Sequence, residues 1–210
     1  MASHRVRIHQ VDFWFDPVCP YSWTASRWLL EVERSRPLDI RWHVMSLYLL
    51  NERRTEDPSY ITYLAEVSGV AKVASAAAAA HGQAVLRDLY AGFGTRIFDE
   101  WRYASADECR SAIVGALADA GLPTALAKAF DSDGFSPLLR DSHETAVALV
   151  GDECGTPVTR IDGHACYGPI LNSIPRGEMA ERVFDGAQLL AGVPDFYELK
   201  RTRTTAPVFS

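Results

Sequence analysis

The sequence predicts an α/β fold in which a small sheet carries a large helical insertion. Three observations support it: an amino-terminal strand–helix–strand pattern, an alanine-rich stretch of helical character, and a strand signal that returns after that stretch. The 210 residues exceed the about 100–150 of a common single domain but fall short of two. We therefore predict one sheet domain, residues 1–51 and 153–210, interrupted by a helical insertion subdomain, residues 52–152.

The amino-terminal part is predicted to be a β-α-β unit. Residues 5–15 alternate, with Phe13 on one face and Trp14 on the other, as is typical of a strand covered on both sides. Residues 20–36 follow with apolar side chains at helical spacing, and the first half of residues 38–50 is rich in β-formers. The short crossover favours a parallel pair of strands.

The later segments predict several helices and one hairpin. Ser105 or Asp107 is expected to cap a helix of the insertion, because short polar side chains accept hydrogen bonds from the first free amides. Residues 157–167 form two strand signals around an Asp-Gly turn, which predicts a β-hairpin. A helix over residues 176–190 and a short helix over residues 194–201 are expected to complete the chain.

Charge and cysteine content exclude several classes of function. The chain has 21 basic and 27 acidic residues, a net charge of −6, and its basic residues are scattered, so no nucleic-acid partner is expected. Neither an apolar signal segment nor a run of 18 apolar residues is present, so we expect a cytoplasmic protein with no membrane partner. The four cysteines show no metal-ligand spacing, and no metal site is predicted.

Cys19 is the residue best placed for chemistry. It lies where the first strand ends and the first helix begins, next to Pro20, so the amides and dipole of the helix are expected to favour its thiolate. A thiolate is a nucleophile at neutral pH. The alternative is that Cys19 is a small buried apolar residue, as many free cysteines are.

Motifs along the whole chain carry a resemblance to known enzymes. The segment DPVCPYSW (16–23), together with the later GTP (155–157), resembles the DsbA-like branch of the thioredoxin superfamily. More closely, the chain resembles the actinobacterial mycothiol-dependent nitroreductases in the segments DFWFDP (12–17), HVMSL (43–47), GTP (155–157), IPRGE (174–178) and ELKRTRT (198–204). The resemblance implies a thioredoxin-like, DsbA-type sheet in which Cys19 is the nucleophile and Pro157 is a cis-proline facing it.

Ser22 departs from that family, whose C-P-x-C motif carries a second cysteine at this position. A serine hydroxyl forms no disulfide, so it cannot release a mixed disulfide in the way a resolving cysteine does. The segment CPYS (19–22) is similar at three of four positions to the SPYS segment of kappa-class glutathione transferases and 2-hydroxychromene-2-carboxylate isomerases. A lone thiolate is also able to add to a conjugated double bond and leave again, giving a geometric isomer without net redox change.

We therefore predict a Cys19-dependent enzyme that acts covalently on a small conjugated electrophile, as a cis–trans or double-bond isomerase. The alternative is a mycothiol-dependent oxidoreductase, either a nitroreductase or a monothiol disulfide reductase, and a third class is a non-catalytic ligand-binding protein. No tightly bound cofactor is expected, and mycothiol is the co-substrate that the resemblance implies. The expected partner is a small molecule, free or bound to a carrier protein, and a homodimer is the assembly considered.

The predicted site combines three catalytic residues with a set of substrate-binding residues. Cys19, Ser22 and Tyr21 form the catalytic group, in which Tyr21 either donates a proton to a developing enolate or nitro oxygen or simply packs. The substrate-binding residues, with core packing or plain loop structure as the alternative for each, are Pro20, Trp14, Trp23, Tyr48, Asn51, Tyr60, Tyr63, Thr156 and Pro157. Trp42, Glu52 and Arg53 are weaker candidates beside them, and Cys154 is a remote candidate for a substitute resolving thiol.

Overall fold

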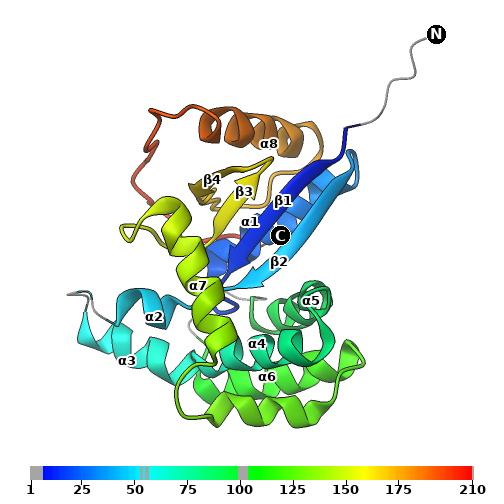
Figure 1. Ribbon diagram of the computed structural model, residues 1–210, viewed down its shortest axis with the longest axis vertical. Helices are drawn as coiled ribbons and strands as arrows, with labels where there is room; N and C mark the ends of the chain where they lie inside the picture. The colour runs from blue at the N-terminus through cyan, green and yellow to red at the C-terminus, as the bar shows by residue number, and fades with distance from the viewer. Residues whose placement is uncertain (1–6, 53, 55–56, 99–103, 210) are drawn as a thin grey trace.

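A four-stranded sheet with helices on both faces and at one end forms the protein, seen here in a computed structural model (Figure 1). The structure describes residues 7–52, 54, 57–98 and 104–209. Its elements are β1 (His9–Phe15), α1 (Pro20–Glu33), β2 (Leu38–Val44), α2 (Leu47–Asn51), α3 (Pro58–Val67), α4 (Gly69–His81), α5 (Val85–Ile97), α6 (Ala106–Asp119), the 3-10 helix η1 (Thr124–Asp131), α7 (Pro137–Val150), β3 (Val158–Ile161), β4 (His164–Tyr167) and α8 (Gly177–Ala191).

The sheet has the strand order β2-β1-β3-β4. β1 and β2 are parallel, whereas β3 pairs antiparallel with both β1 and β4. This confirms the predicted β-α-β unit with its parallel pair. Helices α1 and α8 cover one face of the sheet, α7 crosses the other, and α3–α6 pack beyond the ends of β1 and β2 (Figure 1). The α/β class is therefore confirmed.

β1 is the central strand and is buried on both faces. Phe13 and Phe15 pack in the main core with Trp28 of α1, while Trp14 on the opposite face packs with Met45 and Val158. The alternating side chains of β1 thus serve two separate cores, which explains why both faces of the strand are apolar. The predicted strand starts at residue 5, but β1 begins at His9, and residues 1–6 lie outside the described part of the chain.

The β3–β4 hairpin turns where the sequence predicts. Asp162 and Gly163 both have positive φ, 50° and 94°, as a two-residue hairpin turn requires. The Asp162 carboxylate also accepts hydrogen bonds from the backbone amide of Gln10 at 3.0 Å and from Nε2 of Gln188 at 2.6 Å. The hairpin turn is therefore tied to β1 and α8.

Every element that the structure describes between β2 and β3 is helical. Ser105, not Asp107, caps α6, and it forms a reciprocal capping box with Glu108. One predicted helix is wrong: residues 194–201 are not helical but extend from the end of α8 along the side of the molecule (Figure 1). Pro194 and the preceding Gly192 end α8, and this segment is exposed with few apolar contacts to hold a helix. The exact borders of the insertion at residues 52 and 152 stay predictions.

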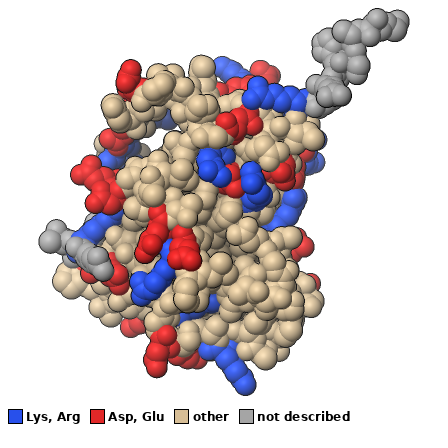
Figure 2. Space-filling model, viewed as in Figure 1, with Lys and Arg blue, Asp and Glu red and all other residues tan. Residues whose placement is uncertain are grey.

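The surface is mixed in charge. Figure 2 shows acidic and basic side chains interspersed on this face, without a basic stripe. Among the described residues, no helix is both long and apolar enough to cross a bilayer.

Candidate active site around Cys19

Cys19 occupies the N-cap position of α1. Its backbone amide donates to the carbonyl of Asp16 at 3.1 Å, which closes the turn after β1, and its carbonyl accepts the amide of Trp23 at 3.1 Å. Its sulfur accepts the backbone amide of Ser22 at 3.5 Å. Pro20 at the first helical position has no amide to satisfy, so the turn and the helix start are compatible. The sequence thus places the sulfur against the free amides of the helix.

A cis-proline loop faces this thiol from the other side. The Thr156–Pro157 bond is cis, and the carbonyl of Thr156 lies 3.5 Å from the Cys19 sulfur and accepts the thiol proton. Cys19, Thr156 and Pro157 therefore meet although 137 residues separate the first two. This arrangement leaves backbone groups of the loop next to any group bound to the sulfur.

Two hydroxyl groups beside the thiol lack well-formed partners. The side-chain oxygens of Ser22 and Thr156 are buried and, within the described part of the chain, make no hydrogen bond of good geometry. The Ser22 hydroxyl is nevertheless near enough to the sulfur to lower the pKa of Cys19. Buried polar groups without partners are uncommon in folded proteins.

The protonation state of Cys19 corrects the expectation from the sequence. Burial raises the pKa of the Cys19 thiol above its ordinary value, and the hydrogen bonds from Thr156 and Ser22 oppose this only in part. Cys19 is 4% exposed, so loss of water outweighs the helix start. The expected lowered pKa is therefore wrong: burial favours the protonated form of the thiol.

Asp16 is a buried carboxyl group at the base of the site. It accepts the amides of Val18 at 2.8 Å and Leu47 at 2.6 Å, which ties the Cys19 turn to the start of α2. Burial raises its pKa to about 6 despite these hydrogen bonds. Its charge also raises the pKa of Cys19. Ionisation of Asp16 therefore makes it harder to form the Cys19 thiolate.

The raised pKa of Asp16 predicts a pH-dependent effect of Asp16→Asn on stability. The pKa of Asp16 rises from 3.8 to about 6 on folding, so the folded chain binds more protons than the unfolded chain between these values. The native protein should therefore lose stability as pH rises through this window, by up to about 3 kcal/mol, whereas asparagine does not titrate. Urea unfolding should show that the free energy of unfolding of Asp16→Asn, relative to that of the native protein, is higher at about pH 7 than at about pH 4. Exposed Asp39→Asn is the control, and the same change between the two pH values in both variants would contradict the assignment.

The mouth of the site contains two residues that sequence reasoning missed. The Arg203 guanidinium lies 5.0 Å from the centre of the Tyr21 ring. Burial raises the pKa of Tyr167, and a thiolate at Cys19 raises it further. A Cβ atom at Gly155 would come within 2.7 Å of the Tyr167 hydroxyl, so the absence of a side chain there leaves room for the tyrosine. Arg203 lies in the segment 198–204 that carries the resemblance, but nothing in the sequence marks Tyr167.

Asn51 is positioned near the same loop through another side chain. Its Oδ1 accepts Nη1 of Arg54 at 3.3 Å, and Nη2 of Arg54 donates to the carbonyl of Cys154 at 3.0 Å. Arg54 thus connects the end of α2 with the residues that precede Thr156. Arg53, a weaker candidate, lies outside the described residues.

Two of the aromatic candidates pack in the core. Trp14 lies on the α7 side of the sheet and stacks on His43 at a ring-centroid distance of 4.5 Å, so its role in substrate binding stays a prediction. Trp42 packs edge-on to Phe13 in the main core. Because side chains on both faces of these strands are buried, the sequence does not show which aromatic residues face a ligand.

The remaining aromatic candidates have separate surroundings. Trp23, one turn along α1 from Cys19, packs against Tyr90 and lines a cavity on the flank of the helix. Tyr48 stacks on Phe135 at 5.7 Å, and Tyr60 and Tyr63 lie on α3. The roles of these three tyrosines in substrate binding stay predictions. No group of three possible metal ligands occurs among the residues that the structure describes.

Comparisons with known proteins agree with this geometry. The model of the Rv2466c-like family, described as mycothiol-dependent nitroreductase Rv2466c, matches residues 18–201. The uncharacterized protein Rv2286c of Mycobacterium tuberculosis is 27% identical over 205 residues, which cover 94% of this chain and 84% of that protein.

Two solved structures of oxidoreductases have a similar fold. MdbA, a thiol-disulfide oxidoreductase from Actinomyces oris, has a TM-score of 0.52 and 16% identity, with 85% of this chain and 81% of that chain covered. The probable DsbA oxidoreductase SCO1869 from Streptomyces coelicolor has a TM-score of 0.50 and 16% identity, with 94% and 93% covered. These likenesses show a DsbA-like thioredoxin fold. Because the family match spans most of the chain, from before Cys19 to beyond Thr156, the chain belongs to the Rv2466c-like family of mycothiol-dependent nitroreductases, with mycothiol as co-substrate.

Proposed function

We propose that the protein is a mycothiol-dependent oxidoreductase that works through the single thiol of Cys19. The observation that carries this proposal is the position of the Cys19 sulfur at the start of α1, 3.5 Å from the carbonyl of the cis-proline loop, beside a serine where a dithiol enzyme has its second cysteine. Family membership supplies the co-substrate. The proposal takes the alternative reading of the sequence in preference to the isomerase.

The chemistry is a pair of thiol–disulfide exchanges. The Cys19 thiolate attacks the mycothiol sulfur of a mixed disulfide, forming a new S–S bond, and the other thiolate leaves and takes up the proton given by Cys19. A second mycothiol then attacks the mycothiol sulfur on Cys19, which releases Cys19 and mycothiol disulfide. One mixed disulfide and one mycothiol thus give one free thiol and one mycothiol disulfide, and Ser22 is not needed.

The local geometry supports each exchange. Thr156 accepts the thiol proton in the resting site, and its carbonyl is freed when the sulfur forms a disulfide. The amide of Ser22, which donates to the sulfur, remains to stabilise Cys19 as a leaving thiolate. Because burial raises the pKa of Cys19, we propose that the thiolate forms only when a bound co-substrate is present to receive it.

A nitro compound is the other acceptor that the family description suggests. Two mycothiols reduce one nitro group to a nitroso group, with one mycothiol disulfide and one water as the other products. Tyr21 and Arg203 at the mouth of the site are the groups suited to bind nitro oxygens.

The second candidate function is thiol-assisted isomerisation. The serine at position 22 favours it, because addition of Cys19 to a conjugated carbon and its later expulsion need no second thiol. The C–S bond that forms also breaks, the double bond returns after rotation, and no reductant is consumed. A carrier-bound substrate, a homodimer and a cytoplasmic location also stay predictions.

The amount of mycothiol oxidised for each product distinguishes the two functions. The purified protein is incubated with mycothiol and either a mycothiol mixed disulfide, a nitrofuran or a conjugated polyene, and products are quantified by chromatography. We expect one mycothiol disulfide for each thiol or nitroso product, with the parallel initial-rate lines of a ping-pong enzyme. Isomerisation of the polyene in the absence of mycothiol, without turnover of the other two substrates, would overturn the oxidoreductase in favour of the isomerase.

A further inference from the structure

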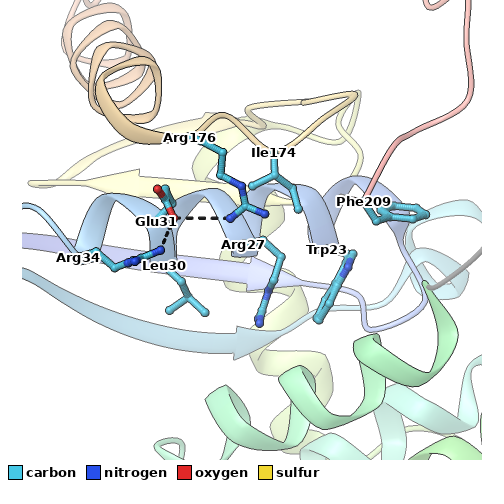
Figure 3. A pocket seen from close by; sticks show the side chains of 8 residues that line it. All are labelled: Trp23, Arg27, Leu30, Glu31, Arg34, Ile174, Arg176 and Phe209. Carbon is cyan, nitrogen blue, oxygen red and sulfur yellow. Dashed lines mark hydrogen bonds and ion pairs between the residues drawn. The ribbon is translucent and has the colours of Figure 1, made fainter.

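A cavity of about 270 Å³ lies on the flank of α1, between that helix, the loop before α8 and the carboxyl-terminal segment (Figure 3). Its lining contains three arginines, one glutamate and several apolar side chains: Trp23, Arg27, Leu30, Glu31, Arg34, Ile174, Arg176 and Phe209. The volume is near the lower end of the about 300–1,000 Å³ of small-molecule sites. Positive charge therefore exceeds negative charge in a space that fits a small molecule.

Arg27 is the unusual member of this lining. Its guanidinium lies 4.1 Å from the centre of the Trp23 ring, and its Nε donates to the Ser26 hydroxyl at 3.2 Å. Its Nη2 is buried and, among the described residues, has no hydrogen-bond acceptor. Burial lowers the pKa of Arg27 to about 10, so the group stays charged at neutral pH. A buried cation without a counter-ion is costly, which makes this group a place where an anion would stabilise the protein.

The one carboxylate of the cavity is already paired elsewhere. Glu31 accepts Arg34 at 3.1 Å and the amide of Gly177 at 3.2 Å, and it lies 3.5 Å from Arg176. Figure 3 shows Arg27 extending beside Trp23 and away from this cluster. Glu31 thus balances the two rim arginines, whose side chains are 78% and 56% exposed, and leaves Arg27 without an anion.

We propose that this cavity binds a small organic anion, a carboxylate or phosphate group attached to a flat apolar ring. The oxyanion pairs with the positive charge of the Arg27 guanidinium, which lines the cavity. Trp23 and Phe209 provide aromatic surface for the ring, and Arg176 at the rim is able to turn from Glu31 to the ligand.

The cavity is separate from the Cys19 site. Neither Cys19 nor Thr156 belongs to its lining, although Trp23 joins the two places because its amide donates to the Cys19 carbonyl at 3.1 Å. The inference therefore goes beyond the proposed oxidoreductase and does not depend on it.

Calorimetric titration with phenyl phosphate, benzoate and inorganic phosphate tests the proposal. We expect at least one of the two ring-bearing anions to bind the native protein with a Kd below about 1 mM, and inorganic phosphate to bind more weakly. Arg27→Met should weaken the binding at least about tenfold, because methionine keeps the packing and removes the charge. The matched control is Arg182→Met, an exposed arginine of α8 outside the cavity, which should bind like the native protein.

Two further readouts keep the test decisive. Unliganded Arg27→Met should melt at the same temperature as the native protein or higher, since an unpaired buried charge is removed. Cys19→Ser should bind the anion as the native protein does. Turnover of a mycothiol mixed disulfide by the native protein tests the proposed function separately. Binding that is equal in Arg27→Met, absent for both ring-bearing anions, or lost in Cys19→Ser would overturn the proposal.

Discussion

Cys19→Ser should reduce mycothiol-dependent turnover to the uncatalysed rate. Serine keeps the size of the side chain and is a better N-cap than cysteine, so α1 should form normally, but its hydroxyl forms no disulfide. Loss of a covalent nucleophile removes up to ~10⁶ of rate in well-studied hydrolases, and we expect a loss on the order of 10³ or more here. Initial rates with a mycothiol mixed disulfide provide the measurement.

Cys166→Ala is the matched control for that loss. Cys166 is a partly buried free thiol of β4 with no contact to the Cys19 sulfur among those described. Its replacement should leave the rate within about twofold, because small changes outside a site seldom affect the chemical step. Turnover that survives in Cys19→Ser, or falls equally in both variants, would show that Cys19 is not the nucleophile.

Ser22→Cys should convert the site into a dithiol centre and increase thiol-driven reduction. The buried Ser22 hydroxyl has no well-formed hydrogen bond to lose, and sulfur is only slightly larger than oxygen, so the substitution should fold. Release of the mixed disulfide then becomes intramolecular, and such steps gain several orders of magnitude in effective concentration. If this release limits turnover, the rate should rise about tenfold or more.

The same variant distinguishes the oxidoreductase from the isomerase. An isomerase should gain nothing, because a second thiol captures Cys19 in a disulfide and removes the nucleophile. Mass spectrometry should show the loss of two hydrogens when the variant is oxidised, and the double variant Cys19→Ser with Ser22→Cys should show neither that loss nor the faster turnover. Unchanged reduction with a fully formed disulfide would contradict the monothiol account.

Much of the fold was predictable because local signals agree with the tertiary structure. The alternation around Phe13 and Trp14, the Asp-Gly turn and the serine caps act over a few residues, and the folded chain contains all of them. The extended segment after α8 was not predictable in this way. Gly192 and Pro194 end α8, and the exposed residues that follow have no packing surface to hold a further helix.

The candidate site was predictable only in its centre. The strand-to-helix position indicated Cys19 and the resemblance indicated Pro157. The pKa of the thiol, however, depends on its burial in the folded chain, and the sequence showed only the helix start. Tyr167 reaches the site through strand pairing with Val158 and the close approach at Gly155, neither of which has a signature in the sequence. Long-range placement of this kind has no local signal.

The most direct test of the single-thiol account is intact-protein mass spectrometry after incubation with mycothiol disulfide. The account predicts one mycothiol adduct per chain, located at Cys19 by peptide mapping, stable until free mycothiol is added and then lost with formation of mycothiol disulfide. An adduct at Cys109, Cys154 or Cys166 in place of Cys19, or no adduct while Cys19 remains a free thiol, would contradict it.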